Sequence, residues 1–98
     1  MDDPLFSIII VNFNGKEYLN NCLTSVFNNA CDDYEIIIVD NGSTDGSIEF
    51  VKDTFSIKLS KIRIINLKRN FGPARARNDG VKIARGKYVG FLDNDTEV

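Results

Sequence analysis

Short apolar runs alternate along the chain with segments of helical periodicity. Two runs of β-branched residues, 7–12 and 35–40, each end in a polar residue, which is typical of strands covered on both faces. Residues 61–67 and 87–92 predict two further strands, the first of them less buried. Apolar residues within 15–28 recur at intervals of three and four positions, so that segment predicts an amphipathic helix.

Two more helices are predicted from the residues that begin and end them. The stretch 42–55 predicts a helix with Ser43 or Thr44 as its N-cap. Residues 73–85 predict another, because a proline lies at its start and a glycine just beyond its end. The resulting order, β-α-β-α-β-α-β with short connections, predicts an α/β fold: a doubly wound, mainly parallel, Rossmann-like sheet with helices on both faces.

Composition narrows the functional classes. The 98 residues form one domain, and 12 basic against 14 acidic residues argue against a nucleic-acid binder. No apolar run is long enough to cross a membrane, and no secretory signal precedes the first strand. We therefore expect a cytoplasmic protein, located in its full-length form either in the cytoplasm or at the cytoplasmic face of the membrane. With no histidine, and with Cys22 and Cys31 expected to be thiols, any metal would be held mainly by oxygen ligands.

Polar side chains follow the predicted strands, and the last strand ends in a D-x-D of Asp93 and Asp95. Ligands of doubly wound sheets bind outside the carboxyl ends of the strands, where the strand order reverses. Two adjacent carboxylates repel each other unless a cation or hydrogen-bond donors lie between them. Mg²⁺ is commonly held by one or two carboxylates plus phosphate oxygens, and Mn²⁺ accepts similar ligands. The position at a strand end favours a cation site over a solvated acidic turn.

Asp40 and Arg77 are two further candidates. Asp40 ends the second strand, where an ionised carboxylate can accept hydrogen bonds from a ribose or a base while the following residues build a turn. Arg77 falls on the expected buried stripe of the third helix, and a guanidinium placed there needs a carboxylate or phosphate partner. That expected stripe consists of Ala74, Val81 and Ala84.

Phe13 follows the first strand and can either stack on a base or cover the sheet edge. Its turn holds a single glycine, and the chain lacks both G-x-G-x-x-G and G-x-x-x-x-G-K-[ST]. The usual dinucleotide and P-loop phosphate sites are therefore absent, which weighs against oxidoreductases and P-loop proteins.

Taken together, the segments SIIIVNFNGKEYLNNCLTSV, EIIIVDNGSTDGS and NFGPARARNDGVKIARGKYVGFLDNDTEV resemble a known family. They look like the amino-terminal half of a family-2, GT-A-fold inverting glycosyltransferase, and the resemblance covers nearly the whole chain. The closing GFLDNDTEV and the GPARARNDG helix start look most like the rhamnosyltransferase-type branch, which builds bacterial cell-surface polysaccharides.

The resemblance implies a nucleotide-diphospho-sugar, linked to UDP, dTDP or GDP, lying across the carboxyl ends of the first, second and fourth strands. It also implies Mg²⁺ or Mn²⁺ on the diphosphate, acting as a Lewis acid. By motif position, Val11, Asn12 and Phe13 would form the wall against which the base lies, and Asp40 would accept a hydrogen bond from the base. Arg77 would lie near the nucleotide. Asp93 would approach the ribose and the metal, and Asp95 would be the principal metal ligand.

The family's general base, a carboxylate far beyond the D-x-D, would lie after Val98. Residues 1–98 are thus expected to be the nucleotide-sugar-binding portion of a glycosyltransferase domain truncated after the D-x-D, inactive by itself and prone to self-association. Two alternatives stay open. A sugar nucleotidyltransferase-like enzyme would normally carry a glycine-rich basic loop after its first strand, and a non-catalytic doubly wound module would bind Mg²⁺ without a nucleotide.

Overall fold

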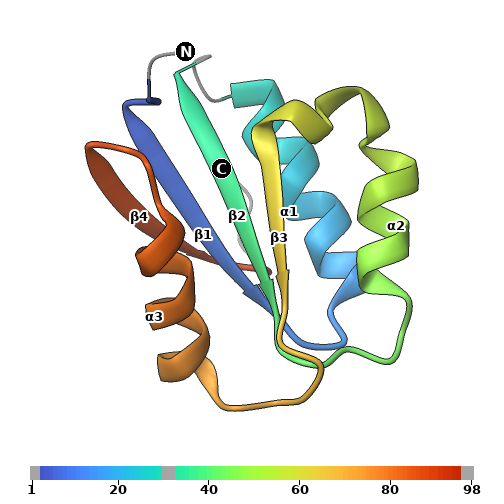
Figure 1. The fold of residues 1–98 in the computed structure, drawn as a ribbon. Coiled ribbons are helices and arrows are strands. Elements are labelled where there is room, and N and C mark those ends of the chain that lie inside the picture. The colour runs from blue at the N-terminus through green and yellow to red at the C-terminus, as the bar shows by residue number, and fades with distance from the viewer. Residues whose placement is uncertain (1–2, 30–32, 96–98) are drawn as a thin grey trace.

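The computed structural model describes residues 3–29 and 33–95, which contain a four-stranded sheet between two layers of helices (Figure 1). The sheet order is β3-β2-β1-β4, and all three neighbouring pairs are parallel. The predicted doubly wound α/β class is therefore confirmed. The strands are β1 (Phe6–Asn12), β2 (Tyr34–Asp40), β3 (Ile62–Asn66) and β4 (Tyr88–Asp93).

Helices cover both faces of the sheet. Helices α1 (Lys16–Asn29) and α2 (Ser47–Thr54) pack on one face, and α3 (Pro73–Ile83) packs on the other. Alternate residues of the central strands supply the two cores: Ile10, Ile36 and Ile38 on the α1 side, and Ile9, Ile37 and Val39 on the α3 side. Burial on both faces explains why these strands are continuous apolar runs rather than alternating ones. Within the described residues, no helix has the length and apolar character that a bilayer span requires.

The buried face of α3 differs from the one predicted. Ala76 and Gly80 are buried against the sheet, whereas Ala74 and Val81 are exposed. A Cβ atom at Gly80 would lie 2.8 Å from Cγ2 of Ile9, so the helix approaches the sheet through its smallest residues. The prediction was right only for the last residue of the stripe, Ala84, which packs on the core from just beyond the helix.

The predicted N-cap of the second helix is wrong. Helix α2 begins at Ser47, after Gly46 with φ of 79°, and its end runs into a 3₁₀ helix, η1 (Ser56–Lys61), that the sequence did not indicate. Ser43 instead donates to Asp40, and the backbone N–H of Thr44 donates to the side chain of Asn14. These two residues belong to the loop after β2 because bonds to the neighbouring strand ends occupy them.

A buried carboxylate, Glu35, joins three elements at the amino ends of the strands. It accepts hydrogen bonds from Ser7 Oγ at 2.6 Å, from Arg63 Nε and Nη2 at 3.0 and 2.6 Å, and from the backbone N–H of Arg85 at 2.7 Å. Burial raises the pKa of Glu35, but these hydrogen bonds and the charge of Arg63 outweigh it and hold the pKa below its usual value. The network fixes the connection between α3 and β4 to the sheet.

Candidate functional site

The loops that follow β1, β2 and β3 gather at one end of the sheet (Figure 1). Asn12 pairs with Asp40 across the β1–β2 ladder, and Val11 pairs with Asp93 across the β1–β4 ladder. The strand order reverses at β1, since β2 and β3 lie on one side of it and β4 on the other. The structure thus brings residues from three strand ends together at the reversal, which is where a doubly wound sheet binds its ligand.

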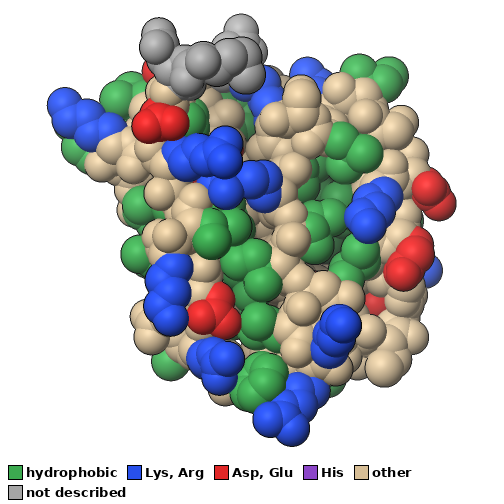
Figure 2. All heavy atoms as spheres, viewed as in Figure 1, with side chains coloured by type: hydrophobic (Ala, Val, Ile, Leu, Met, Phe, Trp, Pro, Cys, Tyr) green, Lys and Arg blue, Asp and Glu red, His purple; other side chains and the backbone are tan. Residues whose placement is uncertain are grey.

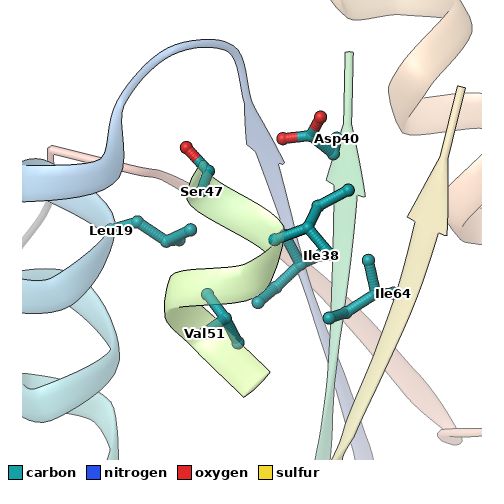
Figure 3. Close-up of a pocket in the computed structure, with 7 residues that line it drawn as sticks. Leu19, Ile38, Asp40, Ser47, Val51 and Ile64 are labelled. Atoms are coloured by element: carbon teal, nitrogen blue, oxygen red, sulfur yellow. The ribbon is translucent and has the colours of Figure 1, made fainter. Parts of the chain in front are cut away.

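Asp40 is 1% exposed and holds the loop after β2. Its Oδ1 accepts hydrogen bonds from Asn12 Nδ2 at 3.0 Å and from Ser43 Oγ at 2.7 Å, and its Oδ2 accepts one from the Ser43 N–H at 2.9 Å. Figure 3 shows the carboxylate at the end of β2, above Ile38 and near the first turn of α2, where Ser47 lies. The apolar pocket below it has no room for a water molecule. Asp40 therefore shapes the loop, and an ionised carboxylate with about four acceptor positions retains one.

Asn12 links all three strand ends. Its side chain is completely buried, and its Nδ2 donates to Asp40 and, at 3.2 Å, to Ser43 Oγ. Its Oδ1 accepts a hydrogen bond from Nδ2 of Asn94, the middle residue of the D-x-D, at 2.9 Å. A continuous chain of side-chain hydrogen bonds therefore runs from the end of β4 through β1 to β2.

Asp93 and Asp95 present carboxylates to solvent at the end of β4. The Asp93 side chain is 77% exposed, and its Oδ1 lies 4.0 Å from Nη2 of Arg77, whose side chain is 47% exposed. Arg77 is thus not buried as predicted, because α3 packs through Ala76 and Gly80. Its expected carboxylate neighbour is nevertheless present, in a pair that water screens.

The two carboxylates suit a hard divalent cation in donor chemistry. Among residues 3–29 and 33–95, no cluster of three or more His, Cys, Asp or Glu side chains could hold a metal. A cation bound by Asp93 and Asp95 would therefore need oxygen ligands from a bound molecule, as when Mg²⁺ shares one or two carboxylates with substrate phosphates.

Val11 and Phe13 flank Asn12 and differ in exposure. Val11 packs against the α3-side core, whereas Phe13, just beyond the end of β1, is 49% exposed. Because Phe13 is exposed, its ring is available to stack on the base of a bound nucleotide.

Several residues at this end of the sheet were predicted only as polar or turn residues and turn out to connect the loops. The side chain of Asn41 accepts from the N–H of Phe71 at 2.9 Å and donates to the carbonyl of Gly72 at 3.1 Å, which ties the end of β2 to the start of α3. Asp45 accepts from the N–H of Lys16 at 3.1 Å and from Ser47, and these bonds outweigh burial and lower the pKa of Asp45. For Asn41 the available signal was its place directly after a strand, whereas Asp45, in the loop before α2, carried no such signal.

The thiol prediction is confirmed for Cys22, which forms no disulfide and whose Sγ lies 3.8 Å from the carbonyl O of Asp93. Cys31 lies outside the described residues. On the face viewed in Figure 2, Lys and Arg side chains are spread among apolar ones rather than gathered in one patch.

Comparison with known proteins adds independent evidence. Residues 7–98 match the Glycosyl transferase family 2 model. The chain is 40% identical over 95 residues to an uncharacterized glycosyltransferase of Haemophilus influenzae, covering 97% of this chain and 38% of the relative. It is 37% identical to the putative teichuronic acid biosynthesis glycosyltransferase TuaG of Bacillus subtilis, covering 94% of this chain and 36% of the relative.

Among solved structures, the chain resembles residues 1–349 of TarS from S. aureus in complex with UDP-GlcNAc. The TM-score is 0.83 with 31% identity, over 97% of this chain and 27% of the TarS chain. The chain thus spans well under half the length of the relatives it matches. A match over nearly the whole chain, a parallel sheet of this order and carboxylates at the strand reversal agree, and the chain belongs to glycosyl transferase family 2.

Proposed function

We propose that this chain binds the nucleoside diphosphate of a nucleotide-sugar across the ends of β1, β2 and β4. In this proposal it forms the donor-binding part of an enzyme that transfers the sugar to an acceptor hydroxyl. The observation that carries the proposal is the pair of exposed carboxylates, Asp93 and Asp95, at the end of β4 beside the end of β1. The similarity to TarS, solved with UDP-GlcNAc, supports the nucleotide-sugar as ligand.

The base lies between the ends of β1 and β2 in this proposal. The exposed ring of Phe13 stacks on it, and Val11 and Asn12 form the wall behind. Asp40 already accepts three hydrogen bonds, and its fourth acceptor position takes an N–H of the base. Uracil, thymine and guanine each carry such an N–H, so this contact fits UDP, dTDP and GDP alike.

The diphosphate lies toward the end of β4. Arg77 is placed beside it, since its guanidinium is half-exposed and lies 4.0 Å from the Asp93 carboxylate. Asp93 and Asp95 would hold Mg²⁺ or Mn²⁺ together with diphosphate oxygens, with Asp95 as the principal ligand and Asp93 also near the ribose. When bound, the cation acts as a Lewis acid for the negative charge of the leaving nucleoside diphosphate.

Inverting transfer also requires a general base on the face opposite the leaving group. We place this base after Val98, so residues 1–98 alone bind the donor without transferring it efficiently. The acceptor in this proposal is a polysaccharide or glycoconjugate, which the name of TuaG supports. We also propose that the reaction takes place on the cytoplasmic side of the membrane. The narrower rhamnosyltransferase-type resemblance stays a prediction. Family membership does not favour a nucleotidyltransferase or a non-catalytic module.

Calorimetric titration with UDP, dTDP and GDP, with and without Mn²⁺, tests the proposal. We expect one nucleotide to bind preferentially and Mn²⁺ to strengthen its binding at least about tenfold, since Asp93 and Asp95 would hold the cation together with phosphate oxygens. Asp95→Ala should abolish the gain from Mn²⁺, while Asp53→Ala, at an exposed position of α2, should keep it. Full metal-dependent affinity in Asp95→Ala would remove the D-x-D from the site, and Mn²⁺ binding without any nucleotide preference would favour the non-catalytic module.

The chain also exposes apolar side chains on α3 and on β4, which is an edge strand. The residues are Val81, Tyr88, Val89 and Phe91. Because an unpaired edge next to apolar surface favours association, we propose that the 98-residue chain self-associates through it.

A further inference from the structure

Asn94 lies between the two carboxylates of the D-x-D and is half-buried, whereas both neighbours are exposed. The β1–β4 ladder ends with Val11 opposite Asp93, so strand pairing does not hold the residues that follow. The Asn94 side chain crosses this gap and donates to Asn12 Oδ1 at 2.9 Å. A second contact, from Cys22 Sγ on α1 to the carbonyl O of Asp93 at 3.8 Å, involves the same backbone stretch.

We propose that Asn94 is a positioning residue, whose hydrogen bond to Asn12 holds the turn after β4 against the end of β1. Asp93 and Asp95 then keep one arrangement toward a divalent cation before it arrives. This inference rests on the proposed function and deepens it, because it assigns a residue that determines how well the two carboxylates bind the metal of the nucleotide-sugar.

The direction of the Asn94 bond follows from the partners of Asn12. The carboxylate of Asp40 only accepts hydrogen bonds when ionised, so the amino group of Asn12 must face it. The carbonyl oxygen of Asn12 then faces β4 and requires a donor. An asparagine at position 94 supplies that donor, whereas an aspartate in its ionised form cannot.

Gly15 shows how closely the amide of Asn94 is seated. A Cβ atom at Gly15 would lie 2.2 Å from Asn94 Nδ2 and 2.8 Å from Asn12 Oδ1. The backbone of Gly15 is outside the left-handed region, so conformation alone does not demand glycine there. Clearance for the Asn94–Asn12 bond therefore accounts for the missing side chain at the start of α1.

Two variants break this contact by independent routes. Asn94→Ala removes the donor, and Gly15→Ala fills its space while leaving Asn94 in place. Without the bond, only a fraction of molecules has the turn in its binding arrangement, and the apparent affinity falls by that fraction. A lost hydrogen bond corresponds to about a five- to tenfold change in such a population.

The experiment measures the affinity of the preferred nucleoside diphosphate with and without Mn²⁺ in the purified protein. We expect both variants to weaken metal-dependent binding about five- to tenfold and to change metal-free binding less than about twofold. The double variant should be no weaker than the worse single one, because both remove one contact. Asn28→Ala, exposed on α1, and Gly90→Ala, where a Cβ would meet nothing within 4 Å, are the matched controls and should behave like the parent.

Two readouts separate positioning from a purely structural role. The EPR spectrum of bound Mn²⁺ should broaden in both variants, since the ligand arrangement becomes heterogeneous. Amide hydrogen exchange at residues 94 and 95 should be faster in both variants than in the parent protein, and this measurement needs no ligand. If Asn94→Ala folds poorly, Gly15→Ala still reports on the same bond.

The outcomes are distinguishable. Unchanged exchange and unchanged metal-dependent affinity in both variants would overturn the role of Asn94 while leaving the proposed function standing. Equal loss of metal-free and metal-dependent affinity would also overturn it, since the bond would then be structural only. A parent protein that binds no nucleoside diphosphate with Mn²⁺ would overturn the proposed function and this inference together.

Discussion

Replacing Glu35 by glutamine should destabilise the protein in a way that depends on pH. Glu35 lies at the amino ends of the strands, and its side chain is 10% exposed, whereas that of its partner Arg63 is 30% exposed. Glutamine preserves the shape but not the charge. The side-chain NH₂ of the glutamine would take the place of one carboxylate oxygen, which now accepts hydrogen bonds either from Arg63 or from Ser7 and the Arg85 N–H. At least one of these donors would therefore lose its acceptor.

The size of the effect follows from this geometry. Removing one partner of a fully buried ion pair costs about 3–5 kcal/mol, and hydrogen bonds to a charged group contribute about 1.5–3 kcal/mol. Since water still reaches Arg63, we expect Glu35→Gln to lower the free energy of unfolding by about 2–3 kcal/mol at pH 7. For a chain of this length the melting temperature should fall by about 10–20 °C.

The pH dependence has a defined sign. The folded state holds the pKa of Glu35 below its usual value, so the ionised form is favoured by folding. The stability from Glu35 is fully present above the unfolded-state pKa of about 4.5 and is lost as the pH falls through the lower folded-state value. The difference between the parent and Glu35→Gln should therefore be largest at pH 7 and shrink toward pH 3.

Urea denaturation of both proteins at pH 7, 5 and 3 measures this difference. Asp45, whose pKa is also lowered, contributes equally to both proteins and cancels. Glu49→Gln on the exposed face of α2 is the matched control and should change stability by less than about 0.5 kcal/mol. A loss that is equally large at pH 3 and pH 7 would refute the reasoning, because the charge of Glu35 would not be its cause.

Three further predictions concern the site and its surroundings. Gly46→Ala should lower the free energy of unfolding by about 1 kcal/mol, because an alanine there meets only the strain of a positive φ. Gly42→Ala should lower it by at least about 2–3 kcal/mol, because its Cβ would in addition lie 2.5 Å from the backbone of Arg69. Chemical denaturation compares the two variants, and equal losses would contradict the close approach at Gly42. Asp40→Asn should cost about 1–3 kcal/mol in thermal unfolding, because an amide cannot accept all three hydrogen bonds, and an unchanged melting temperature would count against that network. Light scattering should show association of the parent that Val89→Lys reduces, and a parent that is monomeric at high concentration would argue against the exposed edge as an interface.

The sequence predicted the fold well, because strands and helices that alternate with short connections leave few arrangements. The runs 7–12 and 35–40 became β1 and β2 with a shift of one residue at their starts. Parallel strands place their carboxyl ends at one edge, so Asp40 and Asp93 could be assigned to the same edge of the sheet before their positions were known.

Helix ends and helix faces were predicted less well. The start of α2 depends on bonds from the loop to Asp40, which ends the preceding strand β2, and to Asn14, which follows β1 and is distant in sequence. The buried face of α3 depends on how closely Gly80 approaches Ile9, and a periodic pattern favours larger apolar residues over glycine.

The sequence by itself determined the class of fold and the edge of the sheet at which the polar side chains of the strand ends collect, while the assignment of ligand-binding residues among them stays a prediction. Only the tertiary structure decided that Glu35 is a buried anchor, that Arg77 is exposed beside Asp93, and that Asn94 bonds to Asn12 across 82 residues of sequence. The reason is physical. Periodicity and capping act over a few residues along one element, whereas the partner of a buried polar group depends on which elements pack together and how closely.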